Sequence, residues 1–97
     1  MGYKMTHNRN STQIVCDLLV ATKECGREGI KTTALISKSN LSHSRMKTFV
    51  STLMSSGLVN QIKFDGKNTF VITPKGHLFL EEYRRFSDMA ESYGLEM

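Results

Sequence analysis

The apolar residues recur at spacings of three and four in three stretches of the first 56 residues of this 97-residue chain. The first stretch predicts a helix that begins near residue 11 and ends at Gly26, which takes a left-handed conformation. The second predicts a brief helix capped by Thr32 or Thr33, with Asn40 in the turn that follows. The third predicts a longer helix over 42–56. A short helix, a turn and a longer helix in this order form a helix-turn-helix unit.

Alternating apolar and polar residues follow the third predicted helix. They predict one strand over 58–64 and a return strand around Phe70, joined by a tight turn at Asp65-Gly66. Residues 29–31 form a separate, short extended segment. Thr73-Pro74 predicts the cap and the first residue of a last helix. The predicted fold class is therefore α+β and mostly helical: a winged helix-turn-helix in the order α-β-α-α-β-β-α, with a C-terminal dimerisation helix.

The third predicted helix has two chemically different sides. Its core side is built from five apolar residues, Met46, Phe49, Val50, Leu53 and Met54. Its opposite side holds hydroxyl groups, one imidazole and two cations, namely His43, Ser44, Arg45, Lys47, Thr48, Ser51 and Thr52. A polar helix face normally mixes charge signs, whereas this face has no carboxylate. The pattern therefore favours a polyanion as the partner of this face.

The positive charge of the chain is concentrated in the same region. The formal net charge is +4, but residues 1–76 carry eleven Lys and Arg against four Asp and Glu, and residues 77–97 carry two against five. Six basic residues and one acidic residue lie between Lys31 and Lys67. This distribution is typical of a nucleic-acid footprint. An ordinary small basic domain is the alternative interpretation.

Length and composition argue against several other classes of protein. A single domain of this length buries about two-thirds of its unfolded surface, which leaves little room for a deep catalytic cleft. Cys16 and Cys25 lie about 13 Å apart along one helix, too far for a disulfide. His7, His43 and His77 fall in three separate elements, so no metal site is predicted. We expect no enzyme, no cofactor and no membrane segment, and a cytoplasmic, nucleoid-associated protein.

Several short motifs carry a family resemblance. They are Asn8-Arg9, Thr33-Ala34-Leu35-Ile36, Asn40-Leu41-Ser42, Leu53-Met54-Ser55-Ser56-Gly57-Leu58-Val59, Phe70-Val71-Ile72-Thr73-Pro74-Lys75-Gly76 and Phe79-Leu80. In their order and spacing the chain resembles small archaeal winged-helix DNA-binding proteins and predicted transcriptional regulators, including the dimeric chromatin-type proteins of that group. The resemblance implies DNA binding without a cofactor and a homodimer formed through the last helix. The chain departs from the family pattern at Phe49, where Tyr is frequent, at Ser37, where an aromatic is common, and in its shorter last helix.

Candidate DNA contacts come from the recognition helix 42–56, the wing 60–70 and their flanks. Arg45 can bond bidentately to guanine, whereas Lys residues more often meet phosphate. The full candidate set is Ser42, His43, Ser44, Arg45, Lys47 and Thr48 in the helix, Lys63, Lys67 and Asn68 in the wing, and Arg9, Lys31 and Lys38 outside both. An ordinary solvated face, and wing lysines that only protect a hairpin edge, are the alternative interpretations.

An aromatic row in the last predicted helix is the candidate dimer interface. Its members are spaced four, three, four and three residues apart, at Phe79, Tyr83, Phe86, Ala90 and Tyr93. Such spacing forms a heptad-like seam along one side of a helix. In the alternative arrangement Phe79 and Tyr83 fold back onto the first helix, which leaves only Phe86 and Tyr93 outside.

These patterns divide the chain into a flexible basic arm (1–10), a winged-helix DNA-binding domain (11–76) and a dimerisation helix (74–93). The predicted function is transcriptional regulation, with double-stranded DNA bound by a homodimer. Two alternatives remain open. One is an architectural, chromatin-type protein with low sequence specificity, and the other is a winged helix used as a protein-interaction module in a transcription complex.

Overall fold

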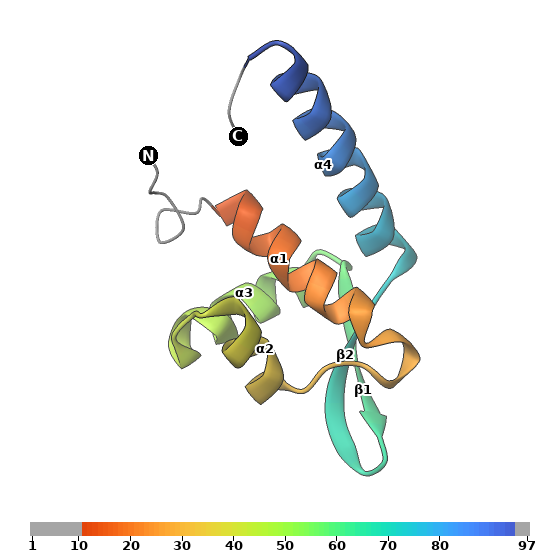
Figure 1. Ribbon diagram of the computed structural model, residues 1–97. Helices are drawn as coiled ribbons and strands as arrows, with labels where there is room; N and C mark the ends of the chain where they lie inside the picture. Colours follow the sequence, from red (N-terminus) through yellow and green to blue (C-terminus); the bar gives the residue numbers. More distant parts are fainter. Residues whose placement is uncertain (1–10, 95–97) are drawn as a thin grey trace.

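The computed structural model describes residues 11–94, so the predicted basic arm and Arg9 lie outside the described residues. Its helices and hairpin strands follow the predicted order (Figure 1). Between the first two helices the chain forms a 3₁₀ turn, η2, and an isolated bridge at Ile30 in place of the predicted short strand. The elements are α1 (Ser11–Glu24), η2 (Gly26–Glu28), α2 (Thr32–Ser39), α3 (His43–Ser55), β1 (Val59–Phe64), β2 (Lys67–Ile72) and α4 (Pro74–Ser92).

The helix boundaries follow mostly from local chemistry. The Ser42 hydroxyl accepts a hydrogen bond from the Arg45 N–H at 3.3 Å, which confirms Ser42 as the cap of α3. Asn40 ends α2 in the left-handed conformation with φ 62°, as predicted. The predicted threonine cap of α2 is wrong. Lys31 occupies the cap position and Thr32 is the first helical residue, because the Lys31 carbonyl already accepts the first helical hydrogen bond, from the Leu35 N–H at 3.0 Å.

The extended segment before α2 joins the hairpin. β1 and β2 pair antiparallel, and Phe64 lies opposite Lys67 across the turn at Asp65-Gly66. Both turn residues have positive φ, as a two-residue hairpin of this kind requires. Ile30 adds an isolated bridge to β2: its N–H donates to the Phe70 carbonyl at 2.8 Å and its carbonyl accepts from the Phe70 N–H at 2.9 Å. The segment before α2 is thereby attached to the hairpin.

The hydrophobic core lies where α1 meets α2, α3 and the hairpin. Its most deeply buried side chains come from five elements or segments, namely Leu18, Leu19, Ile30, Leu35, Met46 and Val59. The helical residues of this set and Ile30 were predicted to face the core, whereas Val59 was not. The helix-turn-helix unit and the wing therefore share one core.

The start of α4 is held by a close approach at Gly76. The Thr73 hydroxyl lies 2.6 Å from the Gly57 carbonyl oxygen and accepts from the Gly76 N–H at 3.0 Å. A Cβ atom at Gly76 would overlap the Leu58 carbonyl oxygen and lie 2.7 Å from Ile72 Cγ1. Only glycine allows this contact. From here α4 extends beyond the rest of the fold (Figure 1).

The residues of the predicted aromatic seam lie in two environments. Phe79 packs against the core, Tyr83 is half-buried and Ala90 is buried. Phe86 and Tyr93 are 56% and 75% exposed. Leu78 and Met89, which were not in the predicted set, are also more than half exposed. The arrangement corresponds to the alternative in which Phe79 and Tyr83 fold back toward α1.

Candidate nucleic-acid interface

One side of α3 is an exposed row of hydroxyl groups. Met46, Val50 and Leu53 are buried on the inner side. On the opposite side Ser44, Thr48, Ser51 and Ser55 are exposed, spaced four, three and four residues apart. Ser51 and Ser55 were not among the predicted contacts, although the helical period already places them in line with Ser44 and Thr48. We call these four residues the hydroxyl row.

The hydroxyl groups of α3 bond mainly to their own helix. Thr48 Oγ1 donates to the Ser44 carbonyl at 3.2 Å, Thr52 Oγ1 to the Thr48 carbonyl at 3.1 Å, and Ser55 Oγ to the Thr52 carbonyl at 3.1 Å. Each donor proton is thereby used within the helix, while the oxygen lone pairs remain available. These groups can accept hydrogen bonds, for example from the exocyclic amines of cytosine or adenine.

The two flanks of α3 carry its cations. On one flank the Arg45 guanidinium carbon lies 5.7 Å from the centroid of the half-buried Phe49 ring. On the other flank His43 and Lys47 are exposed and line a groove that continues to Phe70 of β2. The hydroxyl row therefore lies between an arginine and a lysine.

The wing presents its predicted contacts at the open end of the hairpin. Lys63 and Asn68 are paired across the strands, Lys67 lies opposite Phe64, and all four are exposed. Phe64 was not predicted as a site residue, yet it is 42% exposed. The alternation of Ile62 and Phe64 in the sequence suggested an inner face, but the core ends before the strand does. The wing tip therefore combines two cations with one aromatic ring.

The two cations that flank α2 lie in different settings. Lys31 is exposed at the cap position of α2. Lys38 forms an ion pair of 3.6 Å with Glu24 at the end of α1, and both side chains are more than half exposed. An exposed pair of this kind contributes little to stability. It does reduce the charge that Lys38 can offer to another partner.

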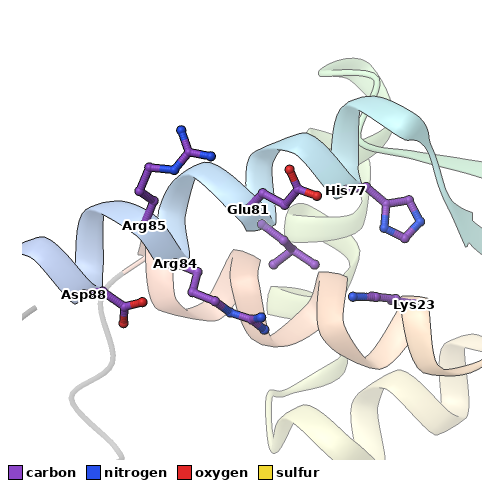
Figure 2. A pocket seen from close by; sticks show the side chains of 7 residues that line it. Lys23, His77, Glu81, Arg84, Arg85 and Asp88 are labelled. Carbon is purple, nitrogen blue, oxygen red and sulfur yellow. The ribbon is translucent and has the colours of Figure 1, made fainter.

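A second charged surface lies between α1 and α4 and has a different character. Lys23 of α1 and residues of α4 line a groove of about 340 Å³. Figure 2 shows Arg84 extending from α4 toward α1, whereas Arg85 points away. Glu81 and Asp88 add negative charge to the same groove. This mixture of signs distinguishes the groove from the carboxylate-free face of α3.

Cysteines and potential metal ligands are the other side chains whose chemistry was assessed from the sequence. Cys16 and Cys25 are free thiols, and burial, aided by the nearby Asp17 carboxylate, raises the pKa of Cys16 to about 11. Within residues 11–94 no three His, Cys, Asp or Glu side chains lie close enough to hold a metal ion. Among the described helices, none is long and apolar enough to cross a membrane.

The sequence and the fold were compared with those of known proteins. Residues 8–91 match the family described as winged helix-turn-helix. The chain is similar to Sso10a-2, a DNA-binding protein from Sulfolobus solfataricus, with a TM-score of 0.71, 20% identity, and coverage of 88% of this chain and 85% of that chain. It is also similar to F-93 of SSV1, with a TM-score of 0.62, 19% identity, and coverage of 89% and 96%. No curated protein sequence matches the chain. The winged-helix fold predicted from the sequence is thereby confirmed.

Proposed function

The chain belongs to the winged helix-turn-helix family, and from this premise we propose that it is a transcriptional regulator that binds double-stranded DNA as a homodimer. The observation that carries the proposal is the exposed side of α3, where the hydroxyl row lies between Arg45 and Lys47 without a carboxylate. A helix of this kind, followed by a basic hairpin, suits the major groove and the adjacent backbone. The description of Sso10a-2 as a DNA-binding protein agrees with this proposal.

In the proposed complex α3 enters the major groove with the hydroxyl row toward the base edges. Arg45 donates to guanine O6 and N7, and the row accepts from base amines. Lys47 on the helix, Lys63 and Lys67 on the wing, and Lys31 before α2 contact phosphates. Ser42, His43 and Asn68 contact the DNA backbone and help to fix the position of the protein along the duplex. Lys38 contributes less, because Glu24 already balances its charge.

The homodimer is proposed to form through the outer side of α4. Leu78, Phe86, Met89 and Tyr93 are each more than half exposed, and they follow one another along the helix. Exposed apolar strips on small domains commonly mark interfaces. Phe79, Tyr83 and Ala90 would support that interface from the inner side of the helix. Two-fold symmetry would present two copies of α3 to half-sites about 34 Å apart.

Architectural binding with low sequence preference is the second candidate function. It is favoured by the internal hydrogen bonds of Thr48, Thr52 and Ser55, because these hydroxyls have little donor capacity left for distinguishing bases. Under this alternative the affinity comes mainly from phosphate contacts, and all duplexes bind alike.

A gel shift at two salt concentrations tests both candidates, using the DNA upstream of the protein's own gene and a random duplex. Selective binding supports regulation, and equal binding supports the architectural alternative. A matched pair of variants tests whether the exposed side of α3 is the DNA-binding surface. Ser51→Glu changes the hydroxyl row, whereas Ser92→Glu changes the exposed end of α4. We expect Ser51→Glu to weaken binding at least about tenfold through charge repulsion, and Ser92→Glu to leave it unchanged. Absence of binding by the unaltered protein would favour the protein-interaction module.

A further inference from the structure

An open apolar groove of about 770 Å³ lies beside the recognition helix. Three parts of the chain form it: the flank of α3, the first residue of α2 and the middle of β2. Its apolar wall is formed by Met46, Val50, Met54 and Phe70. Met54 is 39% exposed, whereas the other three are almost fully buried, so the wall is the outer surface of the core itself. This volume and this apolar lining are those of small-molecule sites.

The α3 edge of the groove carries basic and hydrogen-bonding side chains. His43 and Lys47 are four residues apart on α3 and reach the groove from the same side of that helix. The hydroxyl groups of Thr32 and Ser51 also line it. Of the described residues that line the groove, none is acidic. The edge therefore offers one fixed positive charge and several hydrogen-bonding groups to an anionic group.

We propose that this groove binds a small amphipathic anion, in which an aromatic or short aliphatic body bears a single carboxylate. The body lies against Met46, Val50, Met54 and Phe70, and the carboxylate accepts from Lys47 with His43 beside it. A phosphate backbone gains nothing from contact with an apolar wall, whereas an apolar ring covers the part of the wall that is still exposed, chiefly Met54. The groove between α1 and α4 does not suit such a ligand, because Glu81 and Asp88 line it and Leu80 is its one apolar residue among those described.

Occupancy of the groove would also affect DNA. His43 and Lys47 belong both to the groove and to the proposed DNA surface, so a bound carboxylate and a phosphate compete for the same side chains. This coupling rests on the proposed DNA-binding function, whereas ligand binding itself does not. Because coupling between two sites is reciprocal, DNA should weaken the ligand by the same factor by which the ligand weakens DNA.

Methionine methyl NMR provides a direct test with 2-naphthoate as the probe. Met46 and Met54 line the groove, and Met89 lies 52% exposed on α4 as an internal control. We expect saturable shifts at Met46 and Met54 and none at Met89. The neutral analogue 2-naphthamide should bind at least about fivefold more weakly, because it lacks the charge that Lys47 pairs with. Equal shifts at Met89, or equal binding of the two probes, would overturn the proposal.

Three variants distinguish binding in the groove from non-specific binding to exposed apolar surface. Met54→Glu places a carboxylate at the wall and should weaken 2-naphthoate at least about tenfold, while Val20→Glu, at a similarly exposed apolar position on α1, should leave it unchanged. If Met54→Glu does not fold, Lys47→Gln is the substitute, because Lys47 is exposed. Lys47→Gln should remove the difference between 2-naphthoate and 2-naphthamide. Unchanged binding in the groove variants would contradict the assignment.

A DNA titration distinguishes this inference from the proposed function. If 2-naphthoate binds and no duplex does, the ligand-binding proposal is supported and the DNA-binding proposal fails. If both bind, saturating 2-naphthoate should weaken the duplex at least about tenfold. If duplex DNA shifts Met46 and Met54 while 2-naphthoate does not, the groove is a nucleic-acid contact and the ligand proposal fails.

Discussion

The Arg45 guanidinium lies over the ring of Phe49, one turn further along α3, with 5.7 Å between the guanidinium carbon and the ring centroid. Phe49 is itself half-buried against the core. A cation above an aromatic face is attracted by the ring quadrupole, and the contact restricts the rotamers of the long side chain. The side chain of Arg45 is therefore restricted to the edge of the hydroxyl row in the protein alone.

Arg45→Ala should cost about 1–3 kcal/mol of binding free energy on a preferred site and flatten discrimination at one base pair. Lys63→Ala and Lys67→Ala should instead weaken all sequences evenly, because the proposed role of both lysines is to contact phosphate. Competition binding with a panel of single-base variants measures both effects. If Arg45→Ala weakened every sequence equally, Arg45 would be a phosphate contact and the architectural function would be favoured.

Phe49→Leu keeps an apolar side chain against the core and removes the aromatic face under Arg45. We expect a loss of about 0.5–1 kcal/mol, or about two- to fivefold, on the preferred site. Circular dichroism should show an unchanged fold. The same substitution in an Arg45→Ala background should have no further effect on binding, and an additive loss would show that Phe49 acts independently of Arg45.

DNA affinity should fall steeply with salt. The excess of basic residues in the first 76 positions should neutralise about four to eight phosphates per dimer, with log affinity falling by about 0.9 per contact for each decade of salt. A titration across monovalent salt concentrations gives the slope directly, and Lys67→Ala should reduce it by about one contact per protomer. A flat titration would contradict the electrostatic basis of the interface.

Phe86→Glu should convert a dimer into a monomer, because it places a charge in the middle of the exposed strip on α4. Light scattering at micromolar concentration measures the mass. His77→Glu is the matched control, since His77 is exposed on the side of α4 that lines the groove with Lys23. The proposed interface is wrong if the unaltered protein is a monomer or if Phe86→Glu leaves its mass unchanged.

Stability should decline at alkaline pH because of Cys16. Burial raises the pKa of the Cys16 thiol from 9.0 to about 11, and the nearby Asp17 carboxylate makes a smaller contribution in the same direction. The folded protein therefore favours the protonated thiol. The resulting stabilisation is complete below pH 9 and disappears as the pH rises to about 11. Its upper limit is about 2–3 kcal/mol. Urea unfolding at several pH values should show the decline, and Cys16→Ala should reduce it.

Gly76→Ala should destabilise the protein by about 1–3 kcal/mol, because the added methyl group would overlap the Leu58 carbonyl oxygen and Ile72. Lys75→Ala is the matched control, since Lys75 is exposed at the neighbouring position of the same helix and should change stability by no more than about 0.5 kcal/mol. Thermal unfolding compares the two variants. Equal stability of both would show that α4 can shift to accept a side chain at Gly76.

Local sequence was sufficient wherever a feature depends on neighbours a few residues away. Ser42 caps α3, Asn40 turns the chain in the left-handed conformation, and Asp65-Gly66 closes the hairpin, each as its own residue type predicts. Helical spacing also accounts for the carboxylate-free outer side of α3 and for the burial of Met46, Val50 and Leu53. Met54, predicted on the same core side, is 39% exposed, because the core does not reach that flank of the helix. The predicted contacts on α3 are consequently exposed where the sequence placed them.

Features that depend on distant segments were not readable in the same way. Ile30, which pairs with Phe70 of the hairpin, directly precedes Lys31, and Lys31 is the cap of α2 where the sequence predicted a threonine. The groove beside α3 needs Thr32, Met54 and Phe70, which come together only in the folded chain. No spacing within one element encodes such a surface.

In the last helix, local sequence determined some features and tertiary packing determined others. Sequence alone established a capped, amphipathic helix after Thr73-Pro74 and identified its aromatic row. Only the tertiary structure decided which side of that row meets the rest of the chain. At Gly76 the start of α4 lies directly against Leu58 and Ile72. In this arrangement Phe79 packs inward and Leu78 remains exposed beside it. Helical period specifies which residues share a face, but the packing of neighbouring elements specifies where that face points.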